Sequence, residues 1–300
     1  MTSTITAGRV MTGATAPAAL SVAVAEEFLL LDPVSGRNAA PRERVVTGWC
    51  ADLRRVRTGL GGLREDAAES AEASGARLVA IGATPIGEAG PAGTVCGLHV
   101  SVEAPDREIA AQVPGHLRVW LPVIRALAVN SPLFGGADTG HSSWRSVQTR
   151  HGSGVTTDQR VVTVGVADAC TDLDDAVLVT ALIRAAVATA VSDILDRRPA
   201  PELPDEAVAA AHRGAARDGL AGELLDLRLE RARPAWELVD EFFATVSPAL
   251  LFSGDLDLVV GGLARLRHTG DGAARQRRIL TGTGDVRAVL AALAAWTRTF

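Results

Sequence analysis

Runs of apolar residues in the first part of the chain predict β-strands. Residues 22–31 (VAVAEEFLLL) are apolar except for two adjacent glutamates, and the turn-forming sequence DPVSGR follows at 32–37. Residues 160–167 are mostly β-branched, which is typical of strands. Shorter strand candidates lie at 44–47, 77–81 and 95–102.

Helical spacing of apolar residues dominates the remainder of the chain. Residues 53–73 predict a helix, and Gly75 suits its C-terminal end. Another helix opens at 105–108, and Pro114 is expected to interrupt it because proline removes a backbone donor. The clearest hinge is the proline-rich stretch 199–204. Further helices are expected at 117–129, 174–195, 205–217, 233–245, 256–267 and, with breaks, 273–299.

The order of these elements indicates the fold class. Strands come first and helices follow, which favours an α+β fold over alternating α/β units. Residues 1–20 are small and polar and are expected to be flexible. Residues 21–300 are expected to form one domain, of which the part from 201 to 300 is mainly helical.

Composition limits the classes of function. A chain of 300 residues, 47% hydrophobic and 22% charged, can bury a sizeable core. The formal charge of −5 favours neither nucleic acid nor an anionic membrane as a partner. The sequence contains no lysine, which excludes a lysine-based phosphate clamp such as a P-loop.

Cysteine usage and hydropathy predict a cytoplasmic protein. The three cysteines are odd in number and widely spaced, which argues against a disulfide framework, and no CxxC pair indicates zinc. The N-terminus lacks the long apolar core of a secretory signal. Residues 176–195 are the most apolar long stretch, but Arg184 and Asp193 within it favour a packed helix over a membrane span.

The first strand raises the question of a metal site. Burying a carboxylate costs several kcal/mol unless a metal, a cation or a hydrogen-bond donor compensates it. Glu26 and Glu27 lie in an otherwise apolar strand, so each needs such a partner. Because side chains alternate along a strand, the two glutamates should point to opposite faces of the sheet.

Several ordered blocks of the sequence resemble one known family. The clearest are CGLHVSVEAPDREIA at 96–110 and LRVWLPVIRALAVNSPLFGGADTGHSSWRS at 117–146. They are similar to the CGxHVHVGxPD and LRxWLPxLLALSANSPFxxGxDTGxxSxRS segments of the carboxylate–amine ligases of the glutamate–cysteine ligase type. Shorter blocks at 166–185, 212–220, 249–257 and 269–277 match as well, so the resemblance covers most residues from about 22 to the end.

The resemblance implies a fold and a chemistry. It implies a curved antiparallel sheet, like the barrel or funnel of glutamine synthetase, with helices packed outside. It implies an enzyme that uses ATP and Mg²⁺ to phosphorylate a carboxylate of an amino acid or peptide, after which an amine displaces phosphate from the acyl phosphate. In the family, carboxylates and a histidine on the inner face of the sheet hold the magnesium ions, as hard oxygen ligands should.

Several metal-type positions of the family are replaced in this sequence. Of the family's GxEEEF strand, the first glutamate corresponds to Ala25 and the third to Glu27. A glutamate of the next strand corresponds to Arg44, whose positive charge would oppose bound cations. The family's HVH pair becomes His99 and Ser101, which keeps one histidine. Glu27 and His99 are therefore the candidate metal ligands.

The family's catalytic strand is also changed. Of TVEVRVxD, the glutamate corresponds to Thr163 and the arginine to Gly165. The stretch between Arg150 and Arg160 is much shorter than in the family. Together these replacements argue against activity by the family's usual mechanism.

Each candidate residue also has a purely structural interpretation. Glu27 is a residual metal ligand or, as we favour, the partner of Arg44 across the sheet. His99 binds metal or phosphate or, as a single histidine in an apolar strand, is a hydrogen-bonded core residue. Candidate contacts to ATP lie in matching blocks: Arg145, Arg213 and Arg275. Arg277 also lies in such a block, and in an arginine-rich chain without lysine we favour surface ion pairs as the role of at least half of these four.

Two hypotheses of different classes follow. In the first, the protein is an ATP-dependent ligase with a rebuilt or weakened metal site that acts on an unusual amino acid or peptide. In the second, it is a catalytically inactive relative that works as a binding or regulatory subunit, in a homo-oligomer or with an intact paralogue. Neither hypothesis involves nucleic acid or a membrane.

Overall fold

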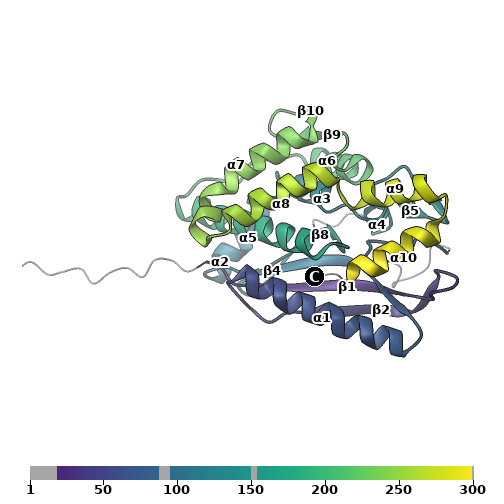
Figure 1. The fold of residues 1–300 in the computed structure, drawn as a ribbon. Coiled ribbons are helices and arrows are strands. Elements are labelled where there is room, and N and C mark those ends of the chain that lie inside the picture. Colours follow the sequence, from purple (N-terminus) through teal and green to yellow (C-terminus); the bar gives the residue numbers. More distant parts are fainter. Residues whose placement is uncertain (1–18, 88–94, 150–153, 299–300) are drawn as a thin grey trace, which may run out of the picture.

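The computed structural model describes residues 19–87, 95–149 and 154–298 (Figure 1). Six strands form one antiparallel sheet in the order β2-β1-β4-β8-β7, with β3 paired to β1. No pairing joins β2 to β7 within the described residues, so no closed barrel is found there. The strand bounds are β1 Val22–Leu31, β2 Asn38–Val46, β3 Arg77–Val79, β4 Gly97–Glu103, β7 Val155–Asp158 and β8 Val161–Asp168.

Helices make up most of the remaining chain, which confirms the α+β class. The first group is α1 Leu53–Ala73, α2 Arg107–Leu117, α3 Leu121–Leu127, α4 Trp144–Gln148 and α5 Leu173–Leu195. The C-terminal group is α6 Asp205–Asp218, α7 Ala235–Ser253, α8 Leu256–Thr269, α9 Gly272–Thr283 and α10 Val286–Thr297. Two short hairpins complete the fold, β5 Leu133–Phe134 with β6 Ala137–Asp138 and β9 Glu223–Asp226 with β10 Arg231–Pro234.

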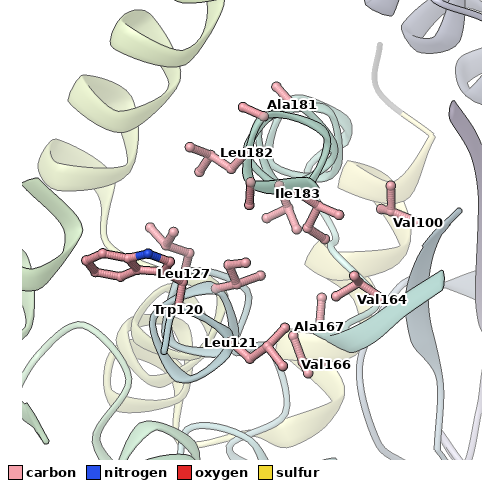
Figure 2. Close-up of a cluster of buried hydrophobic side chains, with 14 of the residues drawn as sticks. Val100, Trp120, Leu121, Leu127, Val164, Val166, Ala167, Ala181, Leu182 and Ile183 are labelled. Atoms are coloured by element: carbon pink, nitrogen blue, oxygen red, sulfur yellow. The ribbon is translucent and has the colours of Figure 1, made fainter. Parts of the chain in front are cut away.

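The main core lies between one face of the sheet and the helices α1, α2, α3 and α5. Alternation along β4 and β8 directs Val100 and Val164 to this face, where both are buried. Figure 2 shows them beside Ile183 of α5, with Leu121 and Leu127 of α3 nearby. Burial of such apolar surface, worth roughly 25 cal/mol per Å², fixes these helices on the sheet.

The long helix α5 is the centre of this core. It is long and apolar enough to cross a membrane by length and composition, but 72% of its most apolar window is buried inside the protein. Arg184, buried at 2% exposure, donates to the carbonyl of Ala51 and pairs with Asp255, so its charge is compensated within the fold. The predicted packed helix is confirmed.

Two predicted boundaries were wrong for identifiable reasons. Helix α2 continues through Pro114 to Leu117, because Val113 and Leu117 are buried against the core and offset the loss of one backbone hydrogen bond. Strand β2 begins at Asn38 rather than at residue 44. Its residues are almost all exposed, so no apolar pattern marks it, and pairing with β1 supplies its backbone partners.

Candidate functional site

Toward the middle of the sheet, the face opposite the main core carries polar and small side chains, and we call this region the polar face; farther along β1, Leu29 and Leu31 on the same face pack against α10. Successive side chains of a strand point to opposite faces of the sheet, so the side chains that face away from α5 gather here. Cross-strand pairs set the neighbours: Ala25 lies opposite His99, and Ser101 lies opposite Thr163. The polar face is defined by Ala25, Glu27, His99, Ser101, Thr163 and Gly165.

Glu26 points away from the polar face, as alternation predicts. It is fully buried, and its two carboxylate oxygens accept hydrogen bonds from Arg64 of α1 at 2.6 and 2.8 Å. Arg64 also donates to the carbonyls of Cys170 and Thr171, at 2.8 and 3.0 Å, just before α5. Glu26 is therefore a structural residue that ties α1 to the start of α5, and it is not solvated.

Glu27 lies on the polar face with protein donors at both carboxylate oxygens. Oε2 accepts from the Gly97 amide at 3.0 Å and lies 3.7 Å from His99 Nε2. Oε1 lies 3.3 Å from Arg42 Nη2. Burial by itself would raise the pKa of Glu27, but His99, Arg42 and the Gly97 amide together hold that pKa below its ordinary value of 4.5.

The partner of Glu27 differs from the predicted one. Arg44 is the residue opposite Glu27 in the strand register, yet its side chain is exposed, and the recorded ion pair is with Arg42. Arg42 lies two residues away on the same face of β2, and Nη1 of its guanidinium donates to the Val95 carbonyl at 3.2 Å. A diagonal neighbour is within reach of a long side chain, so the ion pair forms one step along the strand.

His99 is held by an irregularity in the sheet. Between the pairs Leu98–Ala167 and Val100–Val164, two residues of β8 oppose the single residue His99. One of them is Gly165, and a Cβ added there would lie 2.7 Å from His99 Nδ1. The imidazole therefore occupies the space that any side chain at 165 would need.

Arg145 reaches the same place from α4. Nη2 of its guanidinium donates to the Gly165 carbonyl at 3.1 Å, and Nη1 lies 3.8 Å from Asp168 Oδ1. A Cβ added at Gly97 would lie 2.5 Å from Nη2, so this glycine leaves room for the guanidinium. Of the three candidate arginines, only Arg145 is thus placed next to Glu27 and His99.

A buried network fixes Arg145. Asp168, 1% exposed, accepts hydrogen bonds from Ser131 and Ser143, each at 2.7 Å, and from the Asn130 amide at 2.9 Å. Close by, burial and the charge of Arg145 lower the pKa of Arg125 to about 10. These contacts hold Asp168 beside Arg145, and Arg125 and Arg145 concentrate positive charge behind the polar face.

The other two candidate arginines lie elsewhere. Arg213 of α6 is exposed. Arg275 of α9 pairs with Asp175 of α5 and lies 3.8 Å from Asp172, the residue before α5. The structure therefore does not bring Arg145, Arg213 and Arg275 together.

The two positions that the resemblance matches to the family's catalytic strand carry no charged side chain of their own. Thr163 shares a hydrogen bond with Ser101, with 2.8 Å between their hydroxyl oxygens. Both partners in this hydrogen bond are hydroxyl groups, so the pair contains neither an acid nor a base. Gly165 contributes only its backbone, through the bond from Arg145.

The polar face does not match a magnesium site. In the part of the chain that the structure describes, no group of three or more His, Cys, Asp or Glu side chains is placed to hold a metal ion. Glu27 and His99 converge, but the oxygens of Glu27 already accept from an amide and face a guanidinium. Mg²⁺ requires near-octahedral oxygen coordination, which this arrangement does not supply.

Sequence reasoning missed Arg42, Gly97 and Asp168. Arg42 carried a usable signal, since it shares a face with Arg44 at a spacing of two residues. Gly97 and Asp168 act by leaving space and by orienting Arg145, and neither role has a local sequence signature.

Comparisons with known proteins place this geometry in context. The model of the family described as "Glutamate-cysteine ligase family 2 (GCS2)" matches residues 83–149 and 150–292. A putative glutamate–cysteine ligase 2 from Salinispora tropica is 42% identical over 360 aligned positions, covering 93% of this chain and 95% of the relative. One from Salinispora arenicola is 41% identical over 362 positions, covering 94% and 96%. Both alignments are longer than the chain, so the relatives contain residues without a counterpart here.

Solved structures share the fold at low sequence identity. The glutamate–cysteine ligase of Francisella tularensis in complex with AMP superposes with a TM-score of 0.69 at 10% identity, covering 95% of this chain and 90% of that one. The Pup ligase PafA in complex with ADP gives a TM-score of 0.54 at 15% identity, covering 86% and 66%. These likenesses concern the fold alone.

Proposed function

The chain belongs to glutamate–cysteine ligase family 2, and from this premise we propose that it binds a small anion on the polar face without the family's usual ligase activity. In this proposal the protein is a cytoplasmic binding or regulatory subunit. The anion is a carboxylate or phosphate group, and no magnesium ion is needed to hold it.

The observation that carries the proposal is the state of Glu27. A carboxylate that serves a metal must offer free lone pairs. Both oxygens of Glu27 instead face protein donors, namely the Gly97 amide, Arg42 and His99. The same donors lower the pKa of Glu27, which means that the protein already supplies the positive charge that a metal ion would bring.

Charge on the polar face favours an anionic ligand. Arg42, Arg44 and Arg145 border Glu27, while Asp168 is buried behind Arg145 and its oxygens are occupied. Guanidinium groups bind carboxylates and phosphates through paired N–H donors. Arg145 keeps donors beyond its bond to Gly165, and His99 lies beside it.

Two residues on β8 support the proposal that the protein lacks the family's ligase activity. By the family resemblance, Thr163 and Gly165 stand where a catalytic glutamate and arginine would be. Thr163 is paired with the hydroxyl of Ser101, and a side chain at 165 would collide with His99. Transfer of a phosphoryl group requires charge stabilisation that these two positions do not provide.

A second candidate is a ligase with a weakened metal site. It is favoured by the approach of His99 Nε2 to within 3.7 Å of Glu27 Oε2, and by the identity of 42% to a putative glutamate–cysteine ligase. In this case ATP and Mg²⁺ would bind on the polar face, and Glu27 would have to exchange Arg42 for the ion.

Calorimetry and a turnover assay separate the two candidates. We expect glutamate or ATP to bind with the same affinity in Mg²⁺ and in EDTA, and no ADP to form with any amino acid. The variant Arg145→Ala should lose glutamate binding, whereas Arg231→Ala, on the distant β10 strand, should not. Formation of ADP that requires both Mg²⁺ and an amino acid, and that Glu27→Gln abolishes, would refute the proposal in favour of the weakened ligase.

The subunit role has its own test. The full chain, expressed with an affinity tag in its native host, should co-purify with an intact family member or run as a homo-oligomer. A monomer that shows ATPase turnover by itself would contradict this role.

A further inference from the structure

A large cavity lies between helices, and none of its lining residues belongs to the polar face. Its volume is about 510 Å³, within the range of pockets that hold small organic ligands. Its lining residues come from helices α1, α5, α8, α9 and α10 and from the turn before α5. Of these helices, α1 and α5 pack on the opposite face of the sheet from Glu27, whereas α10 packs on Leu29 and Leu31 and reaches the cavity through Trp296 near its end.

The polar part of the cavity is rich in arginine. Asp174 is shared between Arg57, at 2.6 Å, and Arg265, at 3.8 Å. Asp175, behind the lining, is shared between Arg265 and Arg275. Asp172, also in the lining, lies 3.8 Å from Arg275, so four arginines face three aspartates. A guanidinium has five N–H donors whereas a carboxylate has two oxygens, so donors remain in excess. The lining cations are Arg57, Arg265, Arg275 and Arg278.

One donor in this cluster is buried without a partner. Nε of Arg265 has no hydrogen-bond partner among the described residues, although the atom is shielded from solvent. A buried donor left unpaired is costly, and such a group calls for a water or ligand atom that completes it. Arg278 adds an exposed guanidinium that donates to the Thr269 carbonyl.

The remaining wall of the cavity is apolar. Leu173 and Ile279 line it, and Trp296, with 41% of its surface exposed, stands at its edge. An exposed indole beside arginines can stack on a planar group whose charged end meets the guanidinium groups.

We propose that this cavity is a binding site for an organic anion with a planar apolar body, its carboxylate or phosphate directed at Arg265 and Arg278 and its ring placed against Trp296. The chemistry fits two sources, an aromatic carboxylate and a nucleotide. This site is independent of the polar face and does not depend on the ligase chemistry of the family.

Titration calorimetry with the full chain tests the site. The probes are 2-naphthoate as the aromatic carboxylate, AMP as the nucleotide and inorganic phosphate as an anion without a ring. We expect at least one of the two organic anions to bind, and phosphate to bind more weakly because it cannot contact Trp296. Binding only by 2-naphthoate identifies an aromatic carboxylate site, and tighter binding by AMP identifies a nucleotide site.

Variants locate the bound probe. Arg278→Glu should weaken binding by about tenfold through charge reversal, and Trp296→Ala should weaken it by about fivefold. Arg231→Glu, the same change on an exposed strand far from the cavity, should have no effect. Both Arg278 and Trp296 are exposed, so the variants should fold, which circular dichroism would verify.

Three outcomes would overturn the proposal. One is no heat from either organic anion at millimolar concentration. Another is equal affinity in the wild type, Arg278→Glu and Trp296→Ala. The third is loss of binding in Arg145→Ala with no change in Arg278→Glu, which would place the probe on the polar face.

Discussion

Glu26 and Glu27 are neighbours in the sequence but lie in two different environments on opposite faces of the sheet. Glu26 is fully buried on the helical side, and Arg64 holds both of its oxygens in one closed pair. Glu27 lies on the half-open polar face, where an amide, a guanidinium and an imidazole share its charge. Glu26 thus has one dedicated partner, whereas the identical side chain of Glu27 has several weaker partners.

The difference teaches what each face can do. The pair of Glu26 and Arg64 also joins the carbonyls of residues 170 and 171, so it leaves no group for a ligand. The donors around Glu27 retain unused N–H groups on Arg42 and Arg145, and these lie beside the space next to His99. A buried charge with one dedicated partner, as in Glu26 with Arg64, stabilises the fold. A charge shared among several donors, as at Glu27, leaves donors that can bind a ligand; we call this second arrangement distributed compensation.

The largest expected effect comes from breaking the closed pair. Arg64→Met leaves Glu26 buried without a cation and should lower the free energy of unfolding by about 3–5 kcal/mol. Urea denaturation followed by circular dichroism measures this loss. The double variant Glu26→Leu with Arg64→Met removes both charges and should recover much of the stability. Equal loss in the single and double variants would show that packing, not charge, is what Arg64 supplies.

A smaller effect is expected at Gly165, where the polar face depends on a missing side chain. Gly165→Ala introduces a Cβ 2.7 Å from His99 Nδ1, so the imidazole must move, at a cost of about 1–3 kcal/mol. Gly214→Ala in α6 is the matched control, since no atom lies within 4 Å of the added Cβ. Thermal unfolding compares the two. Gly165→Arg, which restores the family's residue type, should not create ligase activity; ADP formation in that variant would contradict the steric argument.

Much of the fold could be predicted from the sequence, because its main elements have strong periodic signals. The strand at 22–31 and the helix at 53–73 were predicted with the bounds that the structure shows. Alternation also assigned Glu26 and Glu27 to opposite faces. The exposed strand β2 and the continuation of α2 through Pro114 were missed, since pairing and packing with distant elements decide both.

The site was only partly predictable, for a different reason. Glu27 and His99 were identified from the family resemblance, and the structure brings them together. The choice of Arg42 over Arg44 depends on side-chain reach, and the roles of Gly97 and Asp168 depend on space and orientation around Arg145. Such relations join different elements, from Arg42 to Glu27 across neighbouring strands and from Arg145 to Gly97 across the fold, so no local pattern contains them.

The pH dependence of stability should distinguish the two glutamates' environments further. Glu27 has a pKa below 4.5 in the folded protein, so its carboxylate stabilises the fold fully at pH values well above 4.5. As the pH falls through the folded pKa, protonation removes this contribution. The variant Glu27→Gln should therefore be about 1 kcal/mol less stable than the wild type at pH 7 and equal to it in acid. Urea titrations across this range test the sign. Glu43→Gln, an exposed control on β2, should show no such convergence.

The smallest effect on stability, and the most direct test of distributed compensation, is expected at Arg42. Its side chain is 38% exposed, so solvent screens its pair with Glu27, and Arg42→Ala should cost about 0.2–1 kcal/mol. Because His99 and the Gly97 amide still hold Glu27, the fold should persist, while affinity for an anion on the polar face should fall. Arg44→Ala is the matched control for charge on the same strand, since no ion pair to Glu27 is recorded for it within the described residues. If Arg42→Ala destabilised the protein as strongly as Arg64→Met, Glu27 would have one dedicated partner after all, and the two faces would differ only in exposure.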